Sequence, residues 1–153
     1  MIIHTECLPD EALVTSFGID KKSVYHHRNI NKVLAYLYES TDLIAMIDED
    51  PGKSKASYHK LLVEIESKHR IKILEDKKRR HTVIMLCPDL EPWLIQCCKN
   101  AKINMQDYNL PDKPSELHEI INTRLDKISL LVKTMLEKKS PEILFLKKHL
   151  TAK

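Results

Sequence analysis

Five consecutive apolar residues, Leu43–Ile47, are followed directly by two aspartates, Asp48 and Asp50. The run is too short for a buried helix, and because it is apolar at every position neither of its faces suits water. Such a segment is typical of a central strand in a parallel sheet that helices cover on both faces. These sheets bind ligands beyond the carboxyl ends of their strands, which is where Asp48 and Asp50 are expected.

Strand and helix patterns alternate along the first two thirds of the chain. We expect strands at residues 2–5, 23–27 and 43–47, and a hairpin around a charged turn at 76–80. Helices are expected after residue 10, over residues 29–40 and after residue 89, and a further helix would have Tyr58, Leu61, Leu62 and Ile65 on one face. Asp10 and Asp89 suit the N-caps of two of these helices, and Gly18 suits the end of the first. The alternation predicts βαβ units and a Rossmann-like α/β fold with a mainly parallel central sheet.

The last third of the chain has a different pattern. Residues 107–114 contain two prolines and are expected to form a connection, after which apolar residues recur at the helical period. Ser140 and Pro141 are typical of a helix start, and this last helix is expected to run through Leu150. We therefore divide the chain into an α/β domain, residues 1–106, and a C-terminal helical extension, residues 107–153, that packs on the domain or projects from it.

The composition limits the classes of function. The 153 residues are 42% apolar and 31% charged, as in an ordinary soluble domain with a full core. A net charge of +3 permits a nucleic-acid partner without requiring one. No apolar run approaches the roughly 18 residues of a membrane span, so no membrane partner is expected. The four cysteines lack CxxC spacing, which favours reduced thiols in a cytoplasmic protein over a zinc site or a disulfide framework.

The GKS sequence at residues 52–54 looks like the end of a phosphate-binding loop, but the rest of that motif is missing. The motif GxxxxGK[ST] needs a glycine where this chain has Ile47. Acidic side chains would also stand inside the loop and repel phosphate. The sequence therefore excludes this type of phosphate site.

The acidic pair before it has a better chemical interpretation. Asp48 and Asp50 are spaced so that both side chains point the same way from a strand end, and Mg²⁺ prefers carboxylate oxygens. A polar turn without chemistry is the alternative for the pair taken alone. Glu6 favours the metal interpretation, because it also follows a short apolar strand and precedes Asp48 by 42 residues, which is room for a helix, a strand and a second helix.

With these residues in this order, the chain resembles the Toprim superfamily, the catalytic domain of topoisomerases, primases and related nucleases. The family's strand-end glutamate and following aspartate match Glu6 and Asp10 in TECLPDEAL, and its DxD matches Asp48 and Asp50 in AMIDEDPG. The resemblance covers about residues 1–100, and Cys7 replaces the glycine that usually follows the glutamate. It implies a Toprim fold and nuclease-type phosphodiester hydrolysis on DNA or RNA.

The resemblance also implies roles for the acidic residues. Asp48 and Asp50 would hold one or two Mg²⁺ or Mn²⁺ ions, and Glu6 would be a general acid/base or a further ligand, which makes these three the catalytic residues. Asp10 joins the expected metal ligands. The stretch CPDLEPWL resembles one in nucleases of the overcoming-lysogenisation-defect type and adds Glu91, for which favourable placement in the first turn of a helix is an equal alternative. Metal-activated water is the expected nucleophile.

Two short basic segments are the candidates for contacts with nucleic acid. Lys53 and Lys55 follow the DxD pair, and Lys77, Lys78, Arg79 and Arg80 make up most of the charged turn. We expect both segments to contact nucleic-acid phosphates, and a solvated hairpin tip is the alternative for the turn.

Two functions from different classes remain open. The first is the metal-dependent nuclease, working beside a separate ATPase or another protein, because this chain has no ATPase motif of its own. The second is a non-catalytic Toprim-like interaction module whose C-terminal helices bind a partner protein or form a homodimer. The order and spacing of the acidic residues favour the first function, and Cys7 in place of glycine favours the second.

Overall fold

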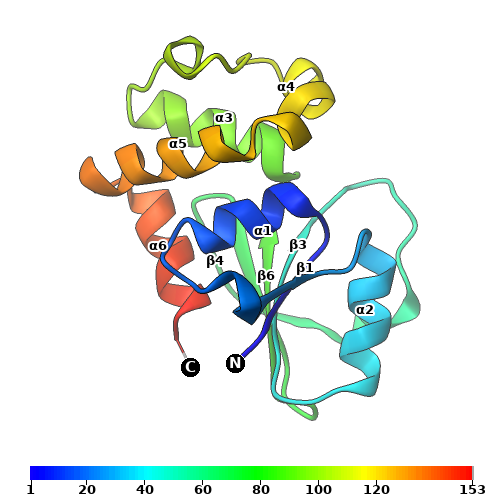
Figure 1. Cartoon of the computed structure of the whole chain (residues 1–153). Helices are drawn as coiled ribbons and strands as arrows, with labels where there is room; N and C mark the ends of the chain where they lie inside the picture. The colour runs from blue at the N-terminus through cyan, green and yellow to red at the C-terminus, as the bar shows by residue number, and fades with distance from the viewer. Residues whose placement is uncertain (153) are drawn as a thin grey trace.

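The computed structural model describes residues 1–152 and has a six-stranded sheet at its centre, flanked by helices (Figure 1). The strands are β1 (Ile3–Thr5), β2 (Val24–His26), β3 (Ile44–Asp48), β4 (Val63–Lys68), β5 (Ile71–Asp76) and β6 (His81–Leu86), in the spatial order β2-β1-β3-β6-β5-β4. The first four in this order are mutually parallel, and β5 and β4 extend the sheet as antiparallel strands. The predicted α/β class and mostly parallel sheet are confirmed.

The helices connect and cover these strands. They are α1 (Leu8–Thr15), α2 (Ile30–Glu39), α3 (Leu90–Asn100), α4 (Pro114–Ile120), α5 (Leu125–Glu137) and α6 (Pro141–Leu150), with short 3₁₀ segments η1 (Lys21–Ser23), η2 (Ser57–Leu61), η3 (Met105–Tyr108) and η4 (Ile121–Thr123). Within residues 1–152, no helix is long and apolar enough to cross a lipid bilayer.

The chain reverses its direction across the sheet between β2 and β3. From β1 it passes through α1 to β2 on one side, and then through α2 to β3 on the other side of β1. The loops after β1 and β3 therefore leave neighbouring parallel strands toward opposite sides. This topological switch point is where sheets of this class bind ligands.

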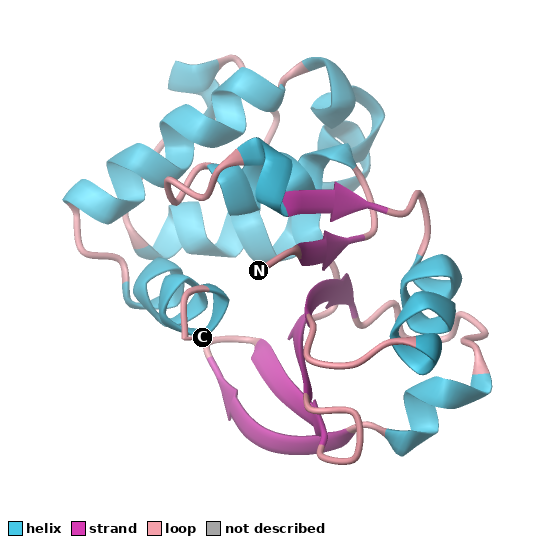
Figure 2. Cartoon of the chain, turned by 60° about the horizontal axis from the view of Figure 1, so that its bottom comes forward, coloured by secondary structure: helices cyan, strands magenta, loops and turns pink. Residues whose placement is uncertain are grey.

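The β3 strand is buried on both faces, as its apolar run predicts. Ile44 and Met46 belong to the core under α1 and α3, whereas Ala45 and Ile47 belong to a second core under α2. This division follows from the alternation of side chains along a strand. Figure 2 shows the larger group of helices gathered on one side of the strands.

The C-terminal helices use their apolar stripe inside the chain. Ile128, Leu131, Val132 and Met135 of α5 are fully buried and belong to the same core as α1 and α3. Figure 1 shows α5 running alongside α1. The helical pattern predicted for this region is therefore present, and the helices pack on the α/β part of the chain.

Two local predictions are wrong. The helix expected on a face of Tyr58, Leu61, Leu62 and Ile65 is instead the short 3₁₀ segment η2 followed by strand β4. The backbone of β4 pairs with β5, and β-branched Val63 and Ile65 suit an extended chain. Four apolar residues close together fit either period over so short a stretch, so the long-range pairing decides.

The first helix also begins and ends earlier than predicted. Cys7, not Asp10, is its N-cap, and the helix ends at Thr15. Asp10 lies at the third helical position, where its carboxylate accepts a hydrogen bond from the backbone N–H of Cys7 at 3.3 Å. Asp10 thus satisfies the free backbone N–H of the N-cap residue, although Asp10 itself lies within the helix.

Candidate metal centre

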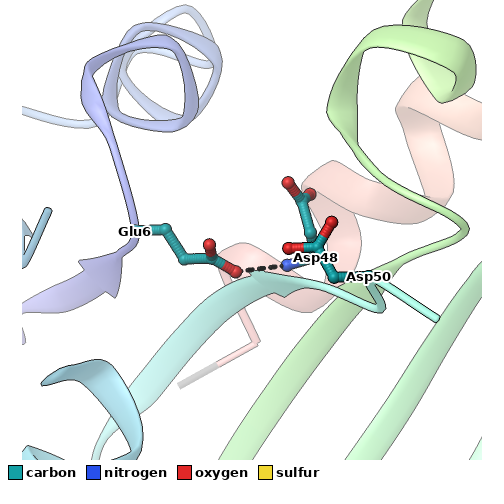
Figure 3. Close-up of side chains that lie close together, drawn as sticks. All are labelled: Glu6, Asp48 and Asp50. Atoms are coloured by element: carbon teal, nitrogen blue, oxygen red, sulfur yellow. Dashed lines mark hydrogen bonds between the residues drawn. The ribbon is translucent and has the colours of Figure 1, made fainter. Parts of the chain in front are cut away.

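Three carboxylates from two neighbouring strand ends meet at the switch point (Figure 3). Glu6 directly follows β1, Asp48 is the last residue of β3, and Asp50 lies two residues farther on. One oxygen of each carboxylate lies within 4.8 Å of the corresponding oxygens of the other two. The structure thus brings together the three residues that the sequence predicts as catalytic, across 42 residues of chain.

Backbone contacts hold these side chains in place. Glu6 Oε1 accepts a hydrogen bond from the backbone N–H of Asp48 at 2.7 Å, which links the two strand ends directly. The backbone N–H of Asp50 donates to Pro88 O at 2.9 Å, after β6 has ended. Asp50 has a φ of +43°, a left-handed conformation that Asp tolerates better than most residues. The chain therefore turns sharply after β3 and keeps Asp50 beside Asp48.

Asp10 lies behind this group. It is only 1% exposed, and its Oδ2 accepts hydrogen bonds from the backbone N–H and the thiol of Cys7, the latter at 3.1 Å. Its carboxylate is not one of the three that converge. The structure therefore places this predicted ligand next to the group, and its metal-binding role stays a prediction. The Cys7 thiol thus contacts the Asp10 carboxylate.

Burial and mutual repulsion disfavour the charged forms of these groups. Burial raises the pKa of Glu6 to about 8, although the hydrogen bond from the Asp48 backbone opposes the shift and the charge of Asp10 adds to it. The pKa of Asp48 is raised by burial and by the charges of Asp10 and Glu6. Burial likewise raises the pKa of Asp10. Without a cation, this cluster therefore binds protons that ordinary carboxyl groups release well below neutral pH.

The donor atoms fit a hard divalent cation. Among the described residues, Asp48 Oδ1 and Asp10 Oδ1 are buried oxygens without a hydrogen-bond partner. Oxygens of this kind are costly unless a cation or a proton satisfies them. Among basic side chains, exposed Lys53 has its Nζ 3.6 Å from Asp50 Oδ1. Carboxylates are the ligands that Mg²⁺ and Mn²⁺ prefer. The group Glu6, Asp48 and Asp50 is accordingly a possible metal-binding cluster.

The predicted fifth acidic residue, Glu91, points to a neighbouring helix. It stands in the first turn of α3, and its Oε1 pairs with His118 Nδ1 of α4 at 2.9 Å. Asp89 caps α3 by position, but its side chain makes no capping hydrogen bond. Burial raises the pKa of Asp89, and the charges of Glu91 and Asp50 raise it further. The charge of Asp89 thus interacts with the acidic cluster, and its side chain differs from that of most N-cap aspartates because it does not hydrogen-bond to the first turn of the helix.

The two groups of basic residues lie at different ends of the sheet. Lys55 donates to the backbone oxygen of Asp50 at 3.2 Å, so it lies at the acidic cluster. The charged turn comes immediately before β6, and β6 runs parallel to β3. Asp48 pairs in register with Leu86, whereas Ile44 pairs with Thr82. The turn is therefore farther from the cluster than these four residues of strand, which span about 13 Å.

Part of the turn has a structural role. The guanidinium of Arg79 lies 4.5 Å from the ring centre of Tyr38 and 3.1 Å from Asp76 Oδ2. Arg80 pairs with Asp42 in the loop that enters β3. Lys77 and Lys78 are exposed. Nucleic-acid binding by the turn stays a prediction, and the structure does not bring it to the carboxylates.

Sequence reasoning missed a second set of polar residues close to this cluster. Lys72 Nζ of β5 pairs with Glu49 Oε2 at 2.6 Å, and both residues line a cleft together with His59 of η2. Lys72 and Glu49 are 23 residues apart and belong to no motif, so only the pairing of β5 beside β6 shows that they meet.

Comparisons of the chain with protein-family models, with curated proteins and with solved structures found no match.

Proposed function

We propose that this protein is a Toprim-like, Mg²⁺- or Mn²⁺-dependent phosphodiesterase that cleaves DNA or RNA by hydrolysis. The convergence of Glu6, Asp48 and Asp50 within 4.8 Å at the switch point carries the proposal. The order of elements supports the Toprim assignment, since the glutamate follows the first strand and the DxD ends the third, with two helices and a strand between them. Nothing in the comparisons bears on it.

Each carboxylate has a role that its surroundings support. Asp48 and Asp50 would hold the ion, because their oxygens converge and one of them is buried without a partner. Glu6, with a pKa of about 8, would exchange a proton with water near neutral pH or complete the metal site. A bound divalent ion would supply charge stabilisation for the phosphate and a more acidic water.

Nucleic acid as the substrate is supported by charge near the site. Lys53 and Lys55 follow the DxD on a loop, and lysines at such positions make favourable contacts with phosphates. A separate ATPase or other protein partner is implied by the family resemblance alone. Cys7, Cys87, Cys97 and Cys98 are free thiols, and on that basis we propose a cytoplasmic location.

The test is a cleavage assay with matched variants. Fluorescent single- and double-stranded DNA and RNA are incubated with the protein in Mg²⁺, in Mn²⁺ or in EDTA. We expect metal-dependent cleavage that Asp48→Asn and Asp50→Asn each reduce at least a hundredfold, while Asp112→Asn, on an exposed loop, leaves it unchanged. Absence of cleavage of all four substrates, or full activity in the Asp48→Asn variant, would overturn the proposal.

A non-catalytic interaction module is the alternative. Cys7 in place of glycine favours it, and its binding surface would be the C-terminal helices. The apolar stripe of these helices is buried against α1 and α3 of the same chain. The stripe is therefore accounted for by folding. Partner binding or homodimerisation through the outer faces of these helices stays a proposal, which sedimentation at micromolar concentration tests.

A further inference from the structure

A cleft of about 390 Å³ opens on the α2 side of the sheet, against the segment that carries the two aspartates. Glu49 and Pro51 of that segment line it, together with residues from η2, β4, β5 and β6. Side chains alternate along the strand end, so Glu49 faces the cleft while Asp48 faces the carboxylate cluster on the other side. The cleft and the cluster thus share one stretch of backbone.

The lining combines an apolar floor with a balanced polar rim. Leu62 and Met85 contribute apolar surface from the core under α2. Two lysines, Lys55 and Lys72, are offset by two glutamates, one of which pairs with Lys72 at 2.6 Å. A cleft without excess positive charge does not select a phosphate group. Instead, it suits a flat, mostly neutral ligand with hydrogen-bonding edges.

His59 adds a neutral donor and acceptor to the rim. Burial lowers the pKa of His59, and the nearby charges of Lys55 and Lys72 lower it further. The imidazole is therefore uncharged at neutral pH, with one N–H donor and one acceptor nitrogen. Together with the Glu49–Lys72 pair, the rim offers both kinds of hydrogen-bonding group that the edges of nucleobases require.

We propose that this cleft binds a nucleobase of the substrate, next to the phosphodiester held at Glu6, Asp48 and Asp50. Its placement relative to cleavage rests on the proposed function. The base would lie on Leu62 and Met85 with its edge toward the Glu49–Lys72 pair. Lys55, which lines the cleft and hydrogen-bonds to Asp50 O at 3.2 Å, connects the base site to the metal-binding loop.

The direct test uses the methionine methyl groups as local probes. The chain has five methionines, and Met85 lines the cleft, whereas Met105 and Met135 lie in the other core. Protein with ¹³C-labelled methionine methyl groups is titrated, in EDTA, with adenosine and cytidine 5′-monophosphates. We expect the Met85 resonance to shift in a saturable manner while Met105 and Met135 do not. An unmoved Met85, or an equal shift with ribose 5-phosphate, would overturn the base site.

Variants separate this inference from the metal proposal. Lys72→Met removes the rim pair, and Leu62→Trp fills the cleft from its edge. Each is expected to weaken nucleotide binding at least tenfold, whereas Lys68→Met, an exposed lysine of β4, is not. Bound Mg²⁺ is expected to raise the melting temperature of the folded protein. All three variants should keep that rise, and Asp48→Asn should lose it but keep the Met85 shift. Unchanged nucleotide binding in both cleft variants contradicts the base site alone, and a missing Mg²⁺ response contradicts the metal site alone.

Discussion

Replacing Asp48 by Asn should stabilise the metal-free protein and abolish its response to Mg²⁺. Asp48 lies with Glu6 and Asp50 in a cluster whose oxygens are within 4.8 Å of one another, and burial and the neighbouring charges raise its pKa. At that separation, two full charges repel by about 3.5 kcal/mol at an effective dielectric constant of 20. Removing the carboxylate removes this repulsion while keeping the shape of the side chain.

The net gain is smaller than the Coulomb figure. Because the pKa values of Asp48 and Glu6 are both raised, the metal-free cluster takes up protons and keeps only part of this repulsion. The new amide also still leaves a buried polar atom without a partner, a cost of about 1–3 kcal/mol. We therefore expect a gain of about 1–2 kcal/mol, which for a chain of this size raises the melting temperature by roughly 2–8 °C. The wild type should gain about 2.7 kcal/mol, or roughly 5–10 °C, when Mg²⁺ is at a hundred times its dissociation constant.

Thermal melts by circular dichroism at pH 7.5, in EDTA and over a Mg²⁺ titration, measure both effects. Asp112→Asn is the matched control, because the same chemical change on an exposed loop should alter neither the metal-free melting temperature nor the Mg²⁺ response. If Asp48→Asn melts below the wild type in EDTA, the carboxylate is not repelled by its neighbours. If the variant still responds to Mg²⁺ as the wild type does, the ion binds elsewhere. Either result refutes the reasoning.

Three further predictions test the charge of Glu6, the packing of the C-terminal helical extension and the contacts of the charged turn. The pKa of Glu6 is raised from 4.5 to about 8, so between these pH values the unfolded chain has lost that proton and the folded chain keeps it. The free energy of unfolding of the metal-free protein should therefore fall as pH rises, by up to about 1.4 kcal/mol per pH unit. Urea melts at pH 5 to 9 measure this slope, which Glu6→Gln should reduce. Ile128→Ala should cost about 2–5 kcal/mol in the same melts, and truncation after residue 106 should prevent cooperative folding, because α5 shares the core of α1 and α3; a folded truncated protein would contradict this. Tyr58→Phe leaves the buried Asp76 without a hydrogen bond of 2.9 Å and should cost about 1–3 kcal/mol, with no change in the Mg²⁺ response.

The central strand and its acidic end could be predicted because both are local signals. A strand whose side chains are all apolar needs other elements packed on both of its faces. Leu43–Ile47 lies between two such cores. Contacts between segments that are distant in the sequence could not be predicted in this way. The segment around Val63 pairs with β5 rather than forming a helix, and the pair between Glu49 and Lys72 depends on which strands become neighbours. Those choices are made by the whole sheet, not by the local sequence.

The direction of strand β6 alone determines that the charged turn lies away from the carboxylate cluster. Glu91 can lie at the carboxyl end of the sheet only if the strand before it, β6, runs parallel to β3. A hairpin turn that leads into β6 must then lie at the opposite end, separated from Asp48 by the six residues of that strand, or about 20 Å. A phosphate-binding role for residues 77–80 at the cluster and a site role for Glu91 are therefore mutually exclusive in any sheet of this topology. A nucleic acid that touches both the turn and the carboxylates must extend over the full height of the sheet, so Lys77→Ala with Lys78→Ala should weaken the binding of long oligonucleotides but not of a dinucleotide.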